Sequence, residues 1–326
     1  MKKNIFIFII LLQIILIIFI VKSISDKKSK SNLNISPINK DSIVTSIQTE
    51  GKLQYFYEPE ANQIIVNNQS WLTKKTKQSI NADSLNETLD YNVAKPPDTF
   101  RIITVGDSFT YGDYVNTAEN YPEQLEARLA SLCTKKIEII NLGVAGYDIQ
   151  YTLERFKKRG IKYNTDMVIW LINSWDFLNN NELLMERVKE IYDEATKSGQ
   201  IDTIAEKEKG YFAWVTAINE LLENFGKEKI LEIQFDHFRE LRNIFPGRLL
   251  ILYFPDQINE LSRNSGFEQF LEKIRNLNSN IFVLPIMPYK SLETLKTDHH
   301  PNSNDYKRMS ILLSRYLIDE AKIPCH

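Results

Sequence analysis

The sequence FRIITVGDSFT occupies residues 100–110 and sets the architecture that we expect for the rest of the chain. Residues 100–105 form an apolar run of strand length, and Gly106 allows a tight turn out of that strand. Ser108 then falls near the start of the next helical segment, where backbone N–H groups and the helix dipole favour negative charge. Asp and Ser are also common helix-capping residues, so this segment alone predicts either a cap or a nucleophile.

Apolar strands alternate with helical patterns from this segment to the end of the chain. The further expected strands are 137–140, 167–172, 248–254 and 281–285, and the expected helices include 121–132, 149–159 and 302–321. Fully apolar strands that alternate with helices indicate a parallel sheet covered on both faces. The sequence therefore predicts a flavodoxin-like three-layer α/β/α sandwich with a five-stranded parallel sheet.

The N-terminus predicts a membrane segment. Lys2 and Lys3 precede an apolar run at residues 5–21 that only Gln13 interrupts. The run lies at the short end of the range for a transmembrane helix and is longer than a typical signal-peptide core. No small-x-small cleavage site follows it. An uncleaved signal anchor over residues 1–22 is the first interpretation, and a cleaved secretion signal is the second.

Composition divides the remaining chain into three parts. Residues 23–50 are rich in Ser, Lys and Asn and predict a flexible stalk. Residues 51–98 predict an extension packed on the main domain, with short β-type segments at 53–57 and 64–66. The main domain occupies residues 99–326. It carries an insertion at about 179–244, either a lid beside the site or plain structural elaboration. The helices expected there are 183–197, 212–225 and 230–244.

Charge and residue counts narrow the classes of function. A formal net charge of −2 argues against nucleic-acid binding, which usually shows a basic field. Two cysteines without C-x-x-C spacing and four histidines offer few ligands for a metal, so we expect neither a metal nor an organic cofactor. Cys133 and Cys325 form a disulfide if the domain is exported, or remain two unrelated thiols.

Polar residues follow three of the expected strands, and a fourth polar segment lies in the loop before the last helix. Sites of open α/β sheets form at the carboxyl ends of strands, so these residues are expected to converge. Ser108 is a candidate nucleophile, and a glycine of residues 141–146 can present its N–H toward it. An amide of residues 173–176 is a candidate oxyanion donor. Residues 298–302 supply a histidine as base and a carboxylate to orient it.

The four segments together resemble the SGNH/GDSL hydrolase superfamily. Gly106-Asp107-Ser108 matches its first block, with Ser108 as nucleophile, and Asn141-Leu142-Gly143 matches the second, with Gly143 as oxyanion donor. Residues 298–302 (DHHPN) match the last block, with His300 as base and Asp298 as its partner. Further similarity at residues 57–60, 80–83 and 95–101 points to a membrane-anchored bacterial subgroup. The resemblance covers roughly residues 55–326 and implies the SGNH hydrolase fold.

The third block departs from the family pattern. Members usually carry Asn-Asp after this strand, and here Trp175 stands where that asparagine would be. Asn173 either supplies the amide instead, or the site lacks that donor, a loss that typically costs about 10²–10³ in rate. Asp107, Trp175 and Asp176 are further candidates for residues that line the substrate.

The resemblance implies a serine-dependent esterase that removes an O-acyl group from a small-molecule ester or from an envelope or secreted glycan. Transfer of the acyl group to a sugar hydroxyl, or a non-catalytic module that binds a glycan or another partner, are the alternatives. Lysines lie on both sides of the apolar run, so the positive-inside rule does not set the orientation. We expect the catalytic domain on the extracytoplasmic side of the membrane because such substrates lie there.

Overall fold

The computed structural model describes residues 53–197, 206–256, 266–295 and 299–325. The predicted anchor and stalk, and Asp298, lie outside these residues. None of the described helices is long and apolar enough to cross a bilayer.

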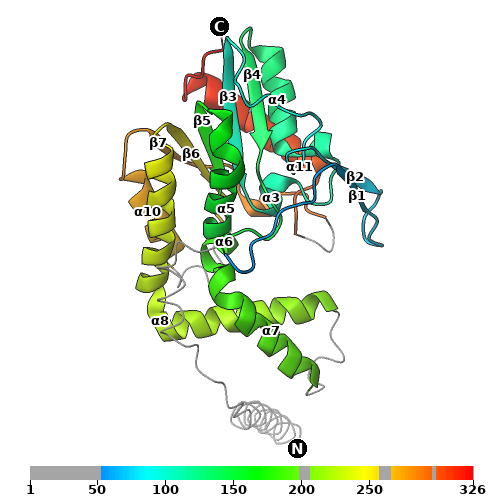
Figure 1. The fold of residues 1–326 in the computed structure, drawn as a ribbon, viewed down its shortest axis with the longest axis vertical. Helices are drawn as coiled ribbons and strands as arrows, with labels where there is room; N and C mark the ends of the chain where they lie inside the picture. The colour runs from blue at the N-terminus through cyan, green and yellow to red at the C-terminus, as the bar shows by residue number, and fades with distance from the viewer. Residues whose placement is uncertain (1–52, 198–205, 257–265, 296–298, 326) are drawn as a thin grey trace, which may run out of the picture. The chain divides into compact units, whose positions relative to one another are not determined.

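The core is the predicted five-stranded parallel sheet (Figure 1). Its order is β4-β3-β5-β6-β7, which is the order 2-1-3-4-5 of flavodoxin-like folds. The strand bounds are Thr99–Gly106 (β3), Lys136–Asn141 (β4), Met167–Leu171 (β5), Arg248–Tyr253 (β6) and Ile281–Pro285 (β7). The chain crosses one face of the sheet after β3 and the opposite face after β5. The loops after these two neighbouring strands therefore meet where ligands bind in such folds.

Helices cover both faces because successive side chains of each strand point to opposite faces. Ile102 and Ile169 pack against α4 (Tyr121–Leu132) and α11 (Ser303–Asp319). Their neighbours Ile103 and Trp170 pack on the other face against α5 (Ile149–Arg155), α8 (Glu206–Ile244) and α10 (Phe267–Arg275). Both layers are built from fully buried Leu, Ile, Val and aromatic side chains, each of which contributes roughly 1.5–3 kcal/mol on burial.

α6 (Ser174–Leu178) follows β5 directly and precedes the predicted insertion. In the described part of the insertion, α7 (Asn181–Lys197) comes first and α8 returns to the sheet. The two helices predicted at 212–225 and 230–244 lie end to end within α8, where Gly226 has a positive φ of 73° and kinks the helix. Figure 1 shows α6 and α7 beyond the carboxyl ends of the strands, on the same side as α3 (Ser108–Tyr111). α10 was not predicted, although its apolar residues have helical spacing.

The N-terminal extension differs from the prediction. Its one hairpin pairs β1 (Gln63–Asn67) with β2 (Thr76–Ile80) in antiparallel register. The strand predicted at 53–57 is wrong, because the side chains of this segment pack on Tyr147 and Tyr151 while its backbone pairs with no strand. β2 was missed because two of the three residues that it buries, Thr76 and Gln78, are polar.

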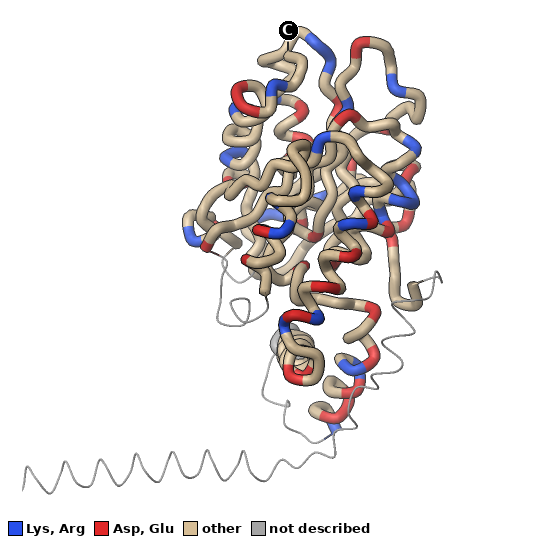
Figure 2. Tube along the Cα trace, turned by 90° about the vertical axis from the view of Figure 1, so that its left-hand side faces the viewer, with Lys and Arg blue, Asp and Glu red and all other residues tan. Residues whose placement is uncertain are grey.

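Short helical turns complete the described chain. They are η1 (Thr117–Glu119), the π-helical turn η2 (Phe156–Gly160), η3 (Ile161–Tyr163) and η4 (Tyr289–Ser291). Figure 2 shows basic and acidic positions interspersed along the described trace.

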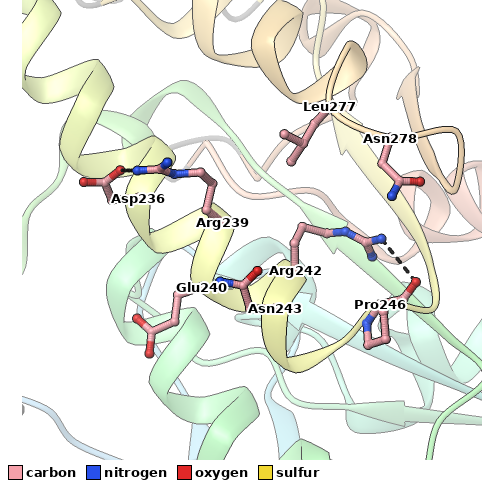
Figure 3. Close-up of a pocket in the computed structure, with 8 residues that line it drawn as sticks. All are labelled: Asp236, Arg239, Glu240, Arg242, Asn243, Pro246, Leu277 and Asn278. Atoms are coloured by element: carbon pink, nitrogen blue, oxygen red, sulfur yellow. Dashed lines mark hydrogen bonds and ion pairs between the residues drawn. The ribbon is translucent and has the colours of Figure 1, made fainter.

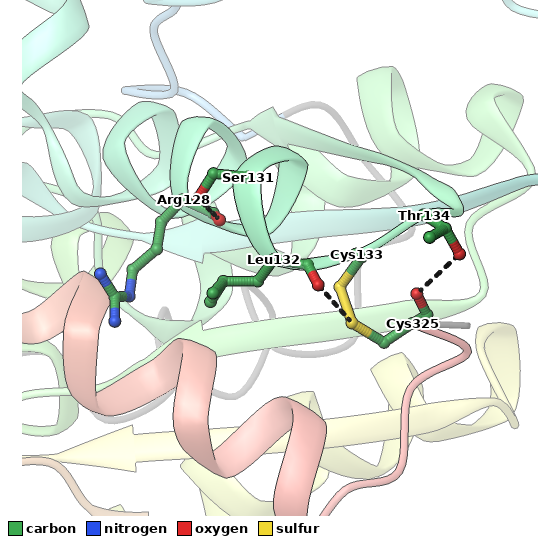
Figure 4. The surroundings of a disulfide bond; sticks show 6 residues. All are labelled: Arg128, Ser131, Leu132, Cys133, Thr134 and Cys325. Atoms are coloured by element: carbon green, nitrogen blue, oxygen red, sulfur yellow. Dashed lines mark hydrogen bonds between the residues drawn. A yellow bond between two sulfur atoms is a disulfide. The ribbon is translucent and has the colours of Figure 1, made fainter.

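A disulfide joins Cys133, at the C-terminal end of α4, to Cys325 near the end of the chain (Figure 4). Thr134 extends the link, because its backbone N–H donates to the Cys325 carbonyl at 2.9 Å. The bond fixes the C-terminal segment that follows α11 onto the helix that α11 packs against. Of the two possibilities for the cysteines, the structure contains the disulfide.

Replacing both cysteines by serine is expected to lower the free energy of unfolding by about 2–5 kcal/mol, because the cross-link restricts the unfolded chain. The bonded residues are 192 positions apart, so the closed loop is long. Urea unfolding of the wild type and the double variant, with and without dithiothreitol, measures the loss. Reductant should destabilise the wild type only; an equal effect on the variant would contradict the assignment.

Candidate active site

The turn from β3 into α3 places Ser108 at a helix N-terminus. Gly106 has φ of 149°, and a Cβ there would lie 2.4 Å from Thr110 Oγ1 and 2.7 Å from the Leu171 carbonyl oxygen. Only glycine fits this turn between β3 and β5. Asp107 caps α3 by accepting the Phe109 N–H at 3.0 Å, and Ser108 is the first helical residue.

The structure brings His300 to Ser108 from a position 192 residues later in the chain. The distance between His300 Nε2 and Ser108 Oγ is 2.7 Å. The imidazole lies between Phe109 and Tyr114, with ring centroids 5.2 Å and 5.5 Å away. The His300 carbonyl accepts the Leu295 N–H at 3.1 Å, and α11 begins just after it with Asn302 as N-cap. Strand β3 and the start of α11 thus hold the two side chains together.

The Ser108 hydroxyl has two acceptors within reach but only one proton to donate. His300 Nε2 is 2.7 Å away, and Asp107 Oδ2 is 3.3 Å away. Donation to His300 requires a ring whose Nε2 carries no proton. This is the proton arrangement that a serine nucleophile requires.

Asn173 contacts Asp107, the residue before Ser108. Its amide nitrogen donates to Asp107 Oδ2 at 2.7 Å, and its carbonyl oxygen caps α6 by accepting the N–H groups of Trp175 and Asp176. These contacts turn the Asn173 amide toward Asp107. We predicted it as an oxyanion donor, which stays a prediction: one of the two N–H groups of its amide donates to Asp107 in this structure.

Asp107 and Asp176 form a buried carboxyl pair behind Ser108. They are 6% and 3% exposed, close to the 8% of Ser108 itself, and their predicted place in the substrate lining stays a prediction. Burial and the negative charge of Asp107 hold the pKa of Asp176 well above its usual range. Asp176 therefore keeps a proton and donates it in a hydrogen bond to Asp107. Its Oδ2 accepts the backbone N–H of Asn173 at 3.0 Å.

Two backbone N–H groups near Ser108 are candidates for an oxyanion hole. The Ser108 N–H, at the first position of α3, has no acceptor among the described residues. Gly143 packs against α3, where a Cβ would lie 2.5 Å from the Tyr111 nitrogen, but its N–H donates to Asn141 Oδ1 at 2.9 Å. The predicted role of Gly143 as oxyanion donor therefore requires its N–H to exchange Asn141 Oδ1 for the substrate oxygen.

Trp175 and the neighbours of His300 complete the surroundings. Trp175 packs against Tyr211 of α8, with ring centroids 5.8 Å apart, and against the core between the sheet and the insertion. Sequence reasoning made Tyr114 only a weak candidate for contact with substrate and gave Phe109 no role; both contact the His300 ring. Position in sequence just after Ser108 was the available signal, but it did not distinguish them from other aromatic residues.

A separate cavity of about 570 Å³ lies at the opposite edge of the sheet (Figure 3). Its lining includes Pro246, which precedes β6, and Asn278, which precedes β7. Arg242 crosses it and donates to the carbonyls of Phe245, Pro246 and Gly247. The amino ends of strands are not where open α/β sheets bind substrates, so we assign no reaction to this cavity.

No family model and no curated protein matches the sequence. The chain is similar in fold to solved GDSL-type esterases and lipases. One, described as lipolytic and of the G-D-S-L family, is from Desulfitobacterium hafniense; it is 18% identical over 66% of this chain and 98% of its own, with a TM-score of 0.41. The esterase EstA from Pseudoalteromonas is 12% identical over 68% and 99%, with a TM-score of 0.42. A family two carbohydrate esterase from Cellvibrio japonicus is 11% identical over 67% and 60%, with a TM-score of 0.40. Similarity at this level indicates the fold alone, so any family assignment rests on the sequence motifs and the site.

Replacing Asp176 by asparagine is expected to make stability less dependent on pH. Folded wild type keeps the Asp176 proton at pH values where the unfolded chain has lost it, so the contribution of this group to stability falls as pH rises above about 4. An amide makes the same two hydrogen bonds without titrating. As pH rises above about 5, the wild type should lose stability relative to D176N, by at most about 1.4 kcal/mol per pH unit.

Urea unfolding at four pH values measures this difference. Asp193→Asn, at an exposed position of α7, controls for the change in net charge. Parallel stability curves for wild type and D176N would show that the pair holds no extra proton.

Proposed function

We propose that this chain is a serine-dependent ester hydrolase of the SGNH/GDSL type. The observation that carries the proposal is the 2.7 Å contact between Ser108 Oγ and His300 Nε2, formed at a helix N-terminus at the carboxyl end of a central strand. A hydroxyl, an imidazole and free backbone N–H groups are together what acyl transfer through a serine requires. The match of residues 106–108 and 298–302 to the family blocks supports the same conclusion.

The reaction would proceed in two halves. Ser108 Oγ attacks the ester carbonyl while His300 Nε2 takes its proton, which gives a tetrahedral intermediate. The intermediate collapses when His300 returns that proton to the departing alcohol oxygen, and the acyl group stays on Ser108. Water then attacks the acyl-serine while His300 takes its proton. His300 passes that proton to Ser108 Oγ as the bond between Oγ and the acyl carbon breaks, and the carboxylic acid leaves. Asp298 is the partner that the resemblance gives to His300, to orient the ring and stabilise its charged form.

The negative oxygen of each intermediate would lie against backbone N–H groups. The Ser108 N–H and the dipole of α3 supply one side, and the loop at residues 143–146 supplies the other. In this arrangement Asn173 acts on the reaction through Asp107, because Asp107 fixes the start of α3 and therefore the direction of the Ser108 N–H.

The disulfide supports a site outside the cytoplasm, because such bonds persist in oxidising compartments. With an uncleaved anchor at residues 1–22, the domain would be tethered to the outer face of the membrane and act on acylated glycans there. A cleaved signal would release the same enzyme into the exterior.

Replacing Ser108 or His300 by alanine is expected to reduce the hydrolysis of 4-nitrophenyl acetate by at least about 10³-fold, because each removes the nucleophile or its base. The assay uses the full-length chain in detergent. Asp176→Asn is the matched comparison, since it changes a residue next to the site but no reacting group.

Labelling separates an enzyme from a binding module. A serine-directed fluorophosphonate should modify the wild type at Ser108 and leave S108A unmodified. If the wild type neither hydrolyses the ester nor takes the label, the chain keeps the fold for binding alone.

A further inference from the structure

The hydrolytic mechanism fixes which half of an ester lies near His300. His300 must protonate the oxygen of the departing alcohol, so the alcohol half of the substrate lies on the imidazole side of Ser108. The carbonyl oxygen lies toward the oxyanion donors, and the acyl chain is the remaining substituent of the carbonyl carbon. Side chains that contact the imidazole and face the site therefore contact the alcohol half.

An aromatic pair stands on the imidazole side. Tyr114 packs against the His300 ring with centroids 5.5 Å apart, in an edge-to-face arrangement. Trp71 packs edge-to-face against Tyr114 with centroids 4.8 Å apart. Both side chains are only partly buried, so each keeps some ring surface in contact with solvent. The row Trp71–Tyr114–His300 extends outward from the nucleophile.

Trp71 reaches this place because the N-terminal hairpin is fixed to the loop after α3. Strand β2 donates its Lys77 N–H to Asn116 Oδ1 at 2.9 Å and its Ser79 N–H to Thr117 Oγ1 at 2.7 Å. The Gln78 side chain donates to the Gly112 carbonyl at 2.9 Å, and this contact is buried. Lys74, in the hairpin loop with Trp71, forms an ion pair with Glu119 at 2.8 Å. These contacts join the extension to the segment that carries Tyr114.

The backbone at Tyr114 is held in an uncommon conformation. Its φ is 63°, in the left-handed region that bulky residues rarely adopt because of the contact between Cβ and the backbone. A residue keeps such a conformation where the surrounding structure imposes it, often beside a functional site. Here it directs the Tyr114 ring between Trp71 and His300.

We propose that Trp71 and Tyr114 form the subsite for the alcohol half of the ester, and that this half is a sugar ring. The inference rests on the proposed hydrolytic function. A pyranose presents an apolar face of C–H groups and a rim of hydroxyls, which matches an amphipathic aromatic surface open to water. The N-terminal extension is then part of the active site and sets its selectivity for glycan esters.

The test compares two acetate esters that differ only in the alcohol. The full-length chain hydrolyses O-acetylated cello-oligosaccharide and ethyl acetate, and released acetate is measured for both. Trp71→Ala should lower kcat/KM for the sugar ester about tenfold more than for ethyl acetate, mainly through KM. Trp71→Phe should recover part of the loss. Val66→Ala, at an exposed position of β1 in the same hairpin, is the control and should match the wild type.

Three results would overturn the subsite. Equal losses on both esters would mean that Trp71 only supports His300, and no loss on either would mean that it contacts no substrate. Altered selectivity between ethyl acetate and ethyl butyrate would place Trp71 on the acyl side.

A binding measurement keeps the subsite separate from the reaction. Isothermal titration of the acetylated oligosaccharide into S108A and into S108A/W71A needs no turnover, and the second should bind about tenfold more weakly. If the wild type is inactive but this difference appears, the proposed hydrolysis fails and the sugar subsite stands. If the two variants bind alike, the subsite fails whatever the activity.

Discussion

The turn at Gly106 is the constraint on which the site depends. The turn passes so close to the Leu171 carbonyl and the Thr110 hydroxyl that a single Cβ would collide with both. Strand β3 therefore runs into α3 at the point where β5 ends beside it. Ser108 gains a helix N-terminus, and Asn173, the first cap residue after β5, comes within hydrogen-bonding distance of Asp107. A side chain at position 106 would push these two strand ends apart and break the contact between Asp107 and Asn173.

Asp107 connects that turn to the electrostatics of the nucleophile. A carboxylate this close to Ser108 competes with His300 for the serine proton and would oppose negative charge on the substrate oxygen. Three donors reduce the competition: the Phe109 N–H, the Asn173 amide and the protonated Asp176. With donors on both of its oxygens, Asp107 acts as a helix cap and competes less for the serine proton. The retained proton on Asp176 costs stability at high pH, and the cap depends on it.

How much could be predicted from sequence varies with the kind of contact. The sheet was predictable because strands buried on both faces, such as Met167–Leu171, are continuous apolar runs. Ser108 and His300 were predictable as a pair because both follow recognisable motifs. The contact of Asn173 with Asp107 was not, since it requires β3 and β5 to be neighbours. Strand β2 escaped because it buries Thr76 and Gln78, whose partners lie in the loop after α3.

The same reasoning explains why the extension had no predicted role in the chemistry. Trp71 is one aromatic residue in a polar loop, and no motif near it predicts that it lies close to His300. Its relation to His300 arises from hydrogen bonds of β2 to side chains of residues 116 and 117 and from the positive φ of Tyr114. These contacts join parts of the chain far apart in sequence, as the Ser108–His300 contact does. Selectivity in this protein therefore depends on docking of a hairpin outside the α/β domain, while the reacting groups depend on the sheet.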